Sequence, residues 1–323
     1  MTFLQLLKNK HIGYVSAIIA AMLFGSVSTI TKPVLEDLNA LSVSSLTYII
    51  AGLSLIPFLK FSFTNSNSNS NSNNTLENTN NTSNKKRKWT DNNRKSYFLL
   101  LLTSLCGAVI APTLFFYGLS ETSASDSSIL INGEVLFSIL FAIVFFNEIL
   151  IRREIIALIL VLVGIVILTT NMQFLSSSNS FVEFNIGNIL IVGSTLFWAL
   201  DNNISKILSK TIHIPKIIVL KTLIGGSLLF ILTIIVFGIA EFDVVDIIHV
   251  PYLVFAGSMG FGASLFFFLH SLKRIGTIKT ILLFSTSSIF GMIFAKVFLN
   301  ENITIYQIIA VGVILGGLYL IKR

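Results

Sequence analysis

Two carboxylates lie inside stretches of the chain that are otherwise apolar, and they are the side chains most suited to chemistry. Glu134 follows Asn132 in one such run, and Asp201 begins the triplet Asp201-Asn202-Asn203 in another. If these runs span a bilayer, each charged group costs roughly 2.5 to 3.5 kcal/mol on insertion scales, so it must face protein or water and find a partner. A carboxylate so placed can bind a cationic or zwitterionic group or exchange a proton.

Aromatic side chains accompany these polar residues. Trp198 precedes Asp201 by three positions and Asn202 by four, which places them on one face of a helix together with Ser194 and Ser205. We expect Trp198, Phe24 and Tyr117 to shape a substrate pocket around Glu134, Asp201, Asn132 and Asn202. The alternative is that the polar side chains only hold helices together through hydrogen bonds.

Other ionisable residues have simpler explanations. Glu148 and Glu301 each follow the end of an apolar run, where helix capping or loop contacts are expected. Lys296 lies one turn before such an end and can extend its ammonium to the headgroups. His270 is expected near a helix end as an interfacial residue.

The sequence contains no pattern typical of an enzyme. The four histidines are scattered, there is no metal-ligand spacing, and no Walker motif is present. We therefore expect no catalytic residue, no metal and no cofactor. The single cysteine, Cys106, lies in an apolar run and is expected to be a packing residue.

The composition is that of a protein in lipid. Of 323 residues, 54% are hydrophobic and 11% are charged, and the mean hydropathy is +0.85. Soluble domains carry roughly 25% charged residues. The net charge of +7 comes from short basic clusters between apolar runs, so we expect a lipid bilayer and a small-molecule substrate as partners and no nucleic acid.

Ten apolar segments are long enough to cross a bilayer as helices, which takes about 20 residues. They fall near residues 12–31, 42–63, 97–118, 125–146, 154–170, 187–208, 215–238, 250–271, 277–299 and 303–321. The sequence therefore predicts an all-α integral membrane protein with ten transmembrane helices.

Charge between these segments alternates. Basic residues gather before the first segment, in every second loop and after the last segment, whereas the other loops carry acidic residues such as Glu36, Asp37, Glu241 and Asp243. By the positive-inside rule, both termini of this multi-pass protein are expected on the cytoplasmic side of the cell membrane. The Asn/Ser-rich stretch at about 63–96 is expected to be a disordered cytoplasmic loop.

The two halves of the chain resemble each other. Ile12–Lys32 aligns with Ile186–Lys206, where Phe24 meets Trp198, and FAIVFFNE at 141–148 aligns with FAKVFLNE at 294–301. Each repeat, 1–170 and 171–323, holds five predicted helices, and an odd number makes the second copy enter the membrane from the opposite side. Such inverted repeats place a site near the bilayer midplane and allow alternating access to it.

The sequence combines ten predicted helices in two halves, F-G/W-A motifs in the first and sixth helices, and paired F-x-x-V-F-x-N-E endings. In these features it resembles the EamA type of the drug/metabolite transporter superfamily. The resemblance implies that helices 1, 3, 4, 6, 8 and 9 line a central cavity. It also implies that helices 5 and 10 are peripheral and form a candidate homodimer contact.

We therefore expect a transporter of small metabolites that works by alternating access. Acidic and aromatic groups favour an amino acid or an amphipathic cation, with efflux as the expected direction and proton coupling left open. A nucleotide-sugar or sugar-phosphate carrier is the alternative, although phosphates favour Lys or Arg clamps. The alternatives from other functional classes are a membrane-embedded enzyme and a channel.

The charge alternation makes a direct prediction about topology. A cysteine introduced at Ser70 should react with a membrane-impermeant thiol reagent only when the reagent has access to the cytoplasmic side, because basic loops are retained there. Labelling of intact cells from outside would reverse the assigned orientation.

Overall fold

The computed structural model describes residues 3–71, 94–146, 151–170, 185–209, 211–275 and 277–320, and all regular structure in these ranges is helical. The first half contains α1 (Phe3–Thr31), α2 (Val34–Asp37), α3 (Ala40–Asn71), α4 (Arg94–Leu105), the π-helix η1 (Cys106–Ile110), α5 (Ala111–Ser120), α6 (Ala124–Leu130), α7 (Gly133–Phe146) and α8 (Arg152–Thr169). The second half contains α9 (Ile186–Leu208), α10 (Ile214–Phe237), the 3-10 helix η3 (Ile239–Val244), α11 (Val250–Phe255), the π-helix η4 (Ala256–Ala263), α12 (Ser264–Ile275), α13 (Thr277–Phe284), α14 (Ser287–Phe298) and α15 (Ile305–Leu320).

Seven helical stretches of the described chain are long and apolar enough to cross a membrane. They are His11–Asp37, Ala40–Pro57, Lys95–Ser120, Ala124–Phe145, Pro215–Phe237, Val250–Ser271 and Lys279–Phe298. The other predicted segments coincide with α8 and α9, which carry charged residues, and with the shorter apolar helix α15. The protein is a multi-pass helical membrane protein.

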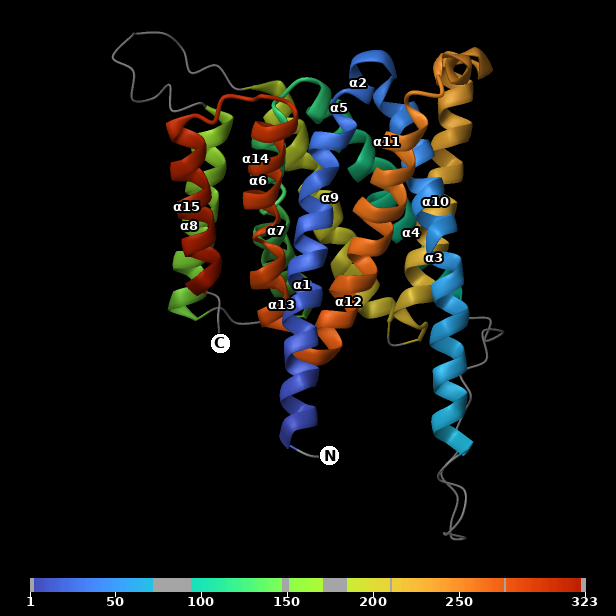
Figure 1. The fold of residues 1–323 in the computed structure, drawn as a ribbon, viewed down its shortest axis with the longest axis vertical. Coiled ribbons are helices and arrows are strands. Elements are labelled where there is room, and N and C mark those ends of the chain that lie inside the picture. The colour runs from blue at the N-terminus through green and yellow to red at the C-terminus, as the bar shows by residue number, and fades with distance from the viewer. Residues whose placement is uncertain are drawn as a thin grey trace.

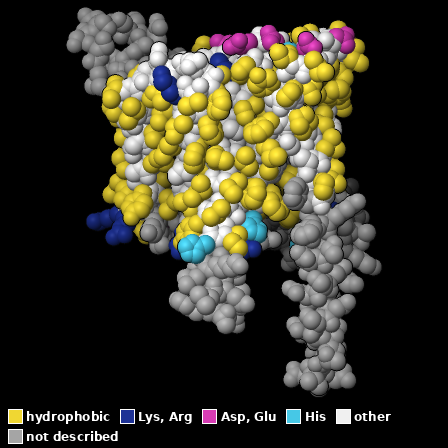
Figure 2. All heavy atoms as spheres, in the orientation of Figure 1, with side chains coloured by type: hydrophobic (Ala, Val, Ile, Leu, Met, Phe, Trp, Pro, Cys, Tyr) yellow, Lys and Arg dark blue, Asp and Glu magenta, His cyan; other side chains and the backbone are white. Residues whose placement is uncertain are grey.

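The two ends of the bundle differ in charge. Hydrophobic side chains cover the flank of the molecule, and Asp and Glu gather at the end where α2 lies (Figure 2). We call this the acidic end, defined by Glu36, Asp37, Asp243 and Asp246, all exposed. The opposite end, where α1 and α8 begin, is called the basic end (Figure 1).

The helices of the two halves pack against each other in a reciprocal way (Figure 1). α1 packs on α12 and α14 of the second half, and α9 packs on α5 and α7 of the first half. α3 packs along α10, and α8 packs along α15. Lys32 after α1 and Asn185 before α9 line the same cavity, so α1 ends where α9 begins and the two helices run in opposite directions.

Two of the long membrane-crossing stretches are interrupted near their middle. A turn at Ile131 and Asn132 separates α6 from α7, and a turn at Ser285 and Thr286 separates α13 from α14. Non-helical backbone at membrane depth is tolerated only where protein or a water-filled cavity satisfies it. The first of these turns places Glu134 at the second position of α7, inside the bundle.

Two described helices extend into the stretch that the sequence predicts as a loop. The loop was expected to be disordered from about residue 63, but α3 continues to Asn71 and α4 already begins at Arg94. Extending an existing helix costs far less than nucleating one, so the preceding apolar turns carry the helix into the Asn/Ser-rich stretch. Residues 72–93 lie outside the described part of the chain.

Close packing of α1 on α14 depends on Gly25. A Cβ built there would lie 3.0 Å from the Gly291 nitrogen and 3.2 Å from the Phe290 Cβ, and would also collide with the Ser287 carbonyl. At Gly312 in α15, an added Cβ meets nothing within 4 Å. The two glycines therefore differ in packing although both are helical.

We expect Gly25→Ala to destabilise the folded protein by about 1–3 kcal/mol, because the extra methyl group overpacks the α1–α14 contact. Thermal unfolding of the detergent-solubilised protein measures the effect as a lower Tm. The matched control, Gly312→Ala, should leave Tm unchanged or raise it, since Ala is the better helix former. Equal Tm values for both variants would show that α1 and α14 are not closely packed.

Candidate functional site

A carboxylate and an amide from different halves meet at the centre of the bundle. Asn202 of α9 donates from its Nδ2 to the Glu134 Oε1 of α7. Glu134 is half-buried and Asn202 is exposed, so the pair is not sealed inside the protein. The sequence predicted both residues as site residues, and the structure brings them together.

Asp201 is held by a partner that the sequence analysis missed. The Lys221 ammonium of α10 forms an ion pair with the Asp201 Oδ2, and the Ser205 hydroxyl donates to the Asp201 Oδ1 at 3.0 Å. Asp201 lies seven positions before the last residue of α9, and Lys221 lies seven positions after the first residue of α10. Both therefore lie about 10 Å inside the basic end at 1.5 Å per residue. The signal available in the sequence was a single Lys inside an apolar run.

The π-helix η1 makes room for this ion pair. A Cβ on Gly107 would collide with the Asp201 carboxyl group, so η1 approaches α9 as closely as its backbone allows. π-helical turns inside α-helices occur frequently at functional sites. Here Gly107 of η1, Lys221 of α10 and Ser205 of α9 lie against the Asp201 carboxylate.

Trp198 is fixed one turn from Asn202. Its Nε1 donates to the Tyr48 hydroxyl and to the Gly107 carbonyl oxygen, each at 3.2 Å. Its ring lies 5.4 Å from that of Phe115, centre to centre. These contacts hold the Trp198 side chain in one orientation, one helical turn from the Glu134–Asn202 hydrogen bond.

Aromatic rings continue from Trp198 across the bundle. Tyr48 lies 5.3 Å from Phe261, Phe261 lies 6.0 Å from Phe24, and Phe24 lies 5.1 Å from Phe284, all measured between ring centroids. The row joins Trp198 of α9 to Phe24 of α1, the two residues that align in the sequence repeat. We call Trp198, Tyr48, Phe261 and Phe24 the aromatic row.

Two other predicted site residues have different surroundings. Asn132 is buried in the turn between α6 and α7, and its Nδ2 donates to the Ile129 carbonyl at 3.2 Å. Tyr117 lies nearer the acidic end, where its hydroxyl donates to the Asn39 Oδ1 at 3.1 Å. Asn132 thus supports the helix break before Glu134, and Tyr117 is bonded to Asn39 between α2 and α3.

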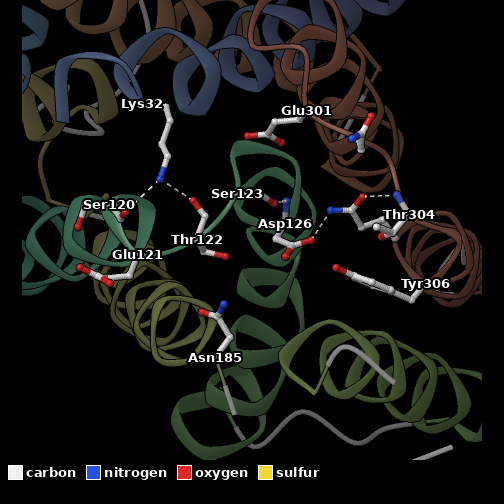
Figure 3. Close-up of a pocket in the computed structure, with 12 residues that line it drawn as sticks. Lys32, Ser120, Glu121, Thr122, Ser123, Asp126, Asn185, Glu301, Thr304 and Tyr306 are labelled. Atoms are coloured by element: carbon white, nitrogen blue, oxygen red, sulfur yellow. Dashed lines mark hydrogen bonds between the residues drawn. The ribbon is translucent and has the colours of Figure 1, made fainter. Parts of the chain in front are cut away.

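A polar cavity of about 470 Å³ opens at the acidic end (Figure 3). Lys32 extends its Nζ across this cavity to the carbonyls of Leu119, Ser120 and Thr122, at 2.7, 3.0 and 2.8 Å. The buried Asp126 accepts from the Gln307 Nε2 at 2.7 Å through its Oδ1. Sequence reasoning missed Asp126 because its predicted place at a helix start makes it look like a capping residue.

Glu301 is a capping residue, as the sequence analysis expected, but it caps a helix of the other half. Its Oε1 accepts from the Ala124 amide at 2.8 Å, and its Oε2 accepts from the Ser125 amide at 3.0 Å and hydroxyl at 2.5 Å. The carboxylate also faces the positive end of the α6 dipole. Glu148, its counterpart in the repeat, lies outside the described residues.

The remaining residues singled out from the sequence lie away from the centre. Lys296 is exposed near the end of α14 and donates to the Asn302 Oδ1 at 3.4 Å. His270 is half-buried in α12 and stacks on Phe266. In the described ranges, no three His, Cys, Asp or Glu side chains come together as a metal site.

The fold defines the class of the protein as a helical membrane protein with polar side chains in its interior, and comparison with known sequences identifies its family. The EamA-like transporter family matches residues 11–170 and 185–323. An uncharacterized transporter of Methanothermobacter thermautotrophicus is 32% identical over 312 residues, which are 96% of this chain and 85% of that protein. The chain belongs to the EamA-like transporter family and is a membrane transporter.

Two further comparisons agree with this assignment. An uncharacterized transporter of Synechocystis sp. is 23% identical over 323 residues, which cover 99% of this chain and 87% of that protein. A protein of known crystal structure superposes with a TM-score of 0.58 at 14% identity, covering 98% of this chain and 96% of its own. At that identity the likeness concerns the fold alone.

The Glu301 cap can be tested by truncation. We expect Glu301→Ala to lower the free energy of unfolding by about 0.5–2 kcal/mol, since the first amides of α6 lose their acceptor. The control is Glu121→Ala, because Glu121 is exposed and lines the same cavity. A lower Tm for Glu301→Ala alone supports the cap, and equal Tm values would contradict it.

Proposed function

We propose that this transporter moves a small organic solute bearing a positive charge by alternating access, with the solute bound between the two halves near Glu134. The observation that carries the proposal is the Glu134–Asn202 hydrogen bond, which joins the halves through a half-buried carboxylate in the interior of the bundle. A charged group at such depth is costly and is retained where it serves a solute or proton.

Alternating access needs two halves that can rock against each other. We propose ten spans arranged as two inverted five-helix repeats, residues 1–170 and 171–323. The opposite directions of α1 and α9 support this arrangement. So does the reciprocal packing, in which α1 contacts α12 and α14 where α9 contacts α5 and α7. Repeats of this kind share a site at their interface.

The chemistry of the centre favours an amino acid or an amphipathic cation as the solute. Glu134 can pair with an ammonium group, and the ring of Trp198 lies one helical turn from Asn202, the hydrogen-bond partner of Glu134. A nucleotide sugar or sugar phosphate is less well matched. Lys221 is already paired with Asp201, and Lys32 is already bonded to three carbonyls, so neither ammonium is available as a phosphate clamp.

We further propose that the acidic end faces outward in the cell membrane, that both termini are cytoplasmic, and that transport is efflux. Polar contacts between the halves gather at the acidic end, including Glu301 with Ser125 and Gln307 with Asp126. His249 with Asp37 is a third such contact, at 3.1 Å. These contacts tie the two halves together at the acidic end, beside the open polar cavity, which suits a state that loads its solute from the basic, cytoplasmic end.

A channel or an enzyme would behave differently from this carrier. Counterflow in proteoliposomes separates them, because only a carrier accelerates exchange when unlabelled solute fills the far side. Tetraphenylphosphonium, a permanent amphipathic cation, and leucine, a zwitterion, serve as radiolabelled probes. The absence of counterflow with both probes would contradict the proposed function.

We expect Glu134→Gln to reduce probe uptake by at least about tenfold while the protein still inserts and folds, because Gln keeps the size and hydrogen bonding of Glu but cannot ionise. Uptake is measured in proteoliposomes with and without a pH gradient and normalised to folded protein. Glu36→Gln, at the exposed acidic end, is the control and should transport as the unmodified protein does. If Glu134→Gln retained full, pH-responsive uptake, Glu134 would be a structural residue.

A further inference from the structure

Three ionisable side chains lie close together inside the bundle, toward its basic end, and their formal charges do not cancel. Lys221 pairs with Asp201, and Glu134 is bonded to Asn202, the residue that follows Asp201 in α9. The Lys221 and Asp201 side chains are only 13% and 3% exposed. With both carboxyl groups ionised and the Lys221 amine protonated, the cluster of Glu134, Asp201 and Lys221 holds one net negative charge.

The positive charge is committed to Asp201. The Lys221 ammonium binds the Asp201 Oδ2, and the Ser205 hydroxyl occupies the Oδ1. Breaking such a buried pair leaves an uncompensated charge and is strongly unfavourable. Lys221 is therefore a fixed partner of Asp201 and not a free ammonium.

Glu134 has a different kind of partner. It accepts a hydrogen bond from the neutral Asn202 amide, and no Lys or Arg of the described residues forms an ion pair with it. A hydrogen bond from an amide satisfies an oxygen atom but leaves the charge of the carboxylate uncompensated. The negative charge available to a solute thus belongs to Glu134.

We propose that Lys221 sets the charge specificity of this site. Because Lys221 neutralises Asp201, only the Glu134 carboxylate is left to pair with a solute, so the preferred solute is an amphipathic monocation. The inference rests on the proposed function and narrows its substrate class. It excludes a zwitterionic amino acid and a dication as preferred solutes.

The reasons against these two classes are electrostatic. The carboxylate of a zwitterion would lie near Glu134 and Asp201, while the nearest ammonium, that of Lys221, is already paired. A dication would bring one charge more than Glu134 compensates, and an unpaired charge at this depth is costly. A monocation avoids both penalties, and its apolar part can pack on Phe24 and Phe261, the half-buried rings of the aromatic row, whose faces also attract cations.

A set of charge variants tests this inference on the purified full-length protein. The binding of three probes is measured by calorimetry: tetraphenylphosphonium as monocation, leucine as zwitterion and methyl viologen as dication. The unmodified protein should bind tetraphenylphosphonium at least about tenfold more tightly than the other two, a ratio that corresponds to about 1.4 kcal/mol.

The single variants should shift this preference in opposite ways. Lys221→Met leaves two uncompensated carboxylates, so the affinity for methyl viologen should rise relative to that for tetraphenylphosphonium by at least about tenfold. Asp201→Asn frees Lys221 to pair with Glu134, so tetraphenylphosphonium affinity should fall by at least about tenfold.

The double variant Lys221→Met/Asp201→Asn restores a net charge of −1 and should regain most of the tetraphenylphosphonium binding that Asp201→Asn loses. It contains no unpaired charge beyond Glu134, so it keeps the test decisive if a single variant fails to fold. Failure of the folded double variant to regain binding would overturn the inference.

The outcomes also separate this inference from the proposed function. A preference of the unmodified protein for leucine or methyl viologen, together with counterflow, would refute the role of Lys221 and leave alternating-access transport standing. Tetraphenylphosphonium binding without counterflow of any probe would refute transport and not the charge preference.

Discussion

The structure depends on the rule that a charge inside a membrane-spanning bundle must be compensated within the protein. Asp201 meets this rule with Lys221 and Ser205, and Glu134 meets it in part with Asn202. Because lipid offers neither hydrogen bonds nor counter-ions, these side chains draw α7, α9 and α10 together. Because the charge of Glu134 is only partly compensated within the protein, this carboxylate is available to pair with a solute.

Backbone irregularities make this arrangement possible. The turn at Ile131 and Asn132 allows Glu134 to enter the bundle at the start of α7, and η1 brings Gly107 against Asp201. The corresponding turn before α14 and the π-helix η4 give the second half similar irregularities. Regular helices would satisfy their own backbones but would not bring these side chains so close.

The polar contacts at the acidic end differ in kind from those between Glu134, Asp201 and Lys221. At the acidic end, Glu301 of the second half caps α6 of the first half, and Lys32 caps the carbonyls at the C-terminal end of α5. These are bonds between side chains and helix ends, which can form and break without exposing a charge to lipid because the end is open to water. Contacts of this kind can hold the two halves of a carrier together at one end and be released during transport. The packed side chains of the aromatic row can keep their positions.

The sequence by itself determined the class of the protein. Apolar runs, alternating loop charge and the repeat depend on local composition, and they predicted a helical membrane transporter with Glu134, Asn202 and Trp198 in its interior. The family match confirms the transporter assignment. Residue type and helical spacing suffice for these features because lipid imposes them on each segment separately.

Only the tertiary structure decided which charges are paired. Lys221 and Asp201 are twenty residues apart on different helices, and Asn202 is 68 residues from Glu134. The bond between Tyr117 and Asn39, 78 residues apart, is likewise visible only in the folded chain. Spacing along one helix specifies which residues share a face, but not which residues pack against that face. The net charge of a site depends on side chains from several helices, and only the packing of those helices brings the side chains together.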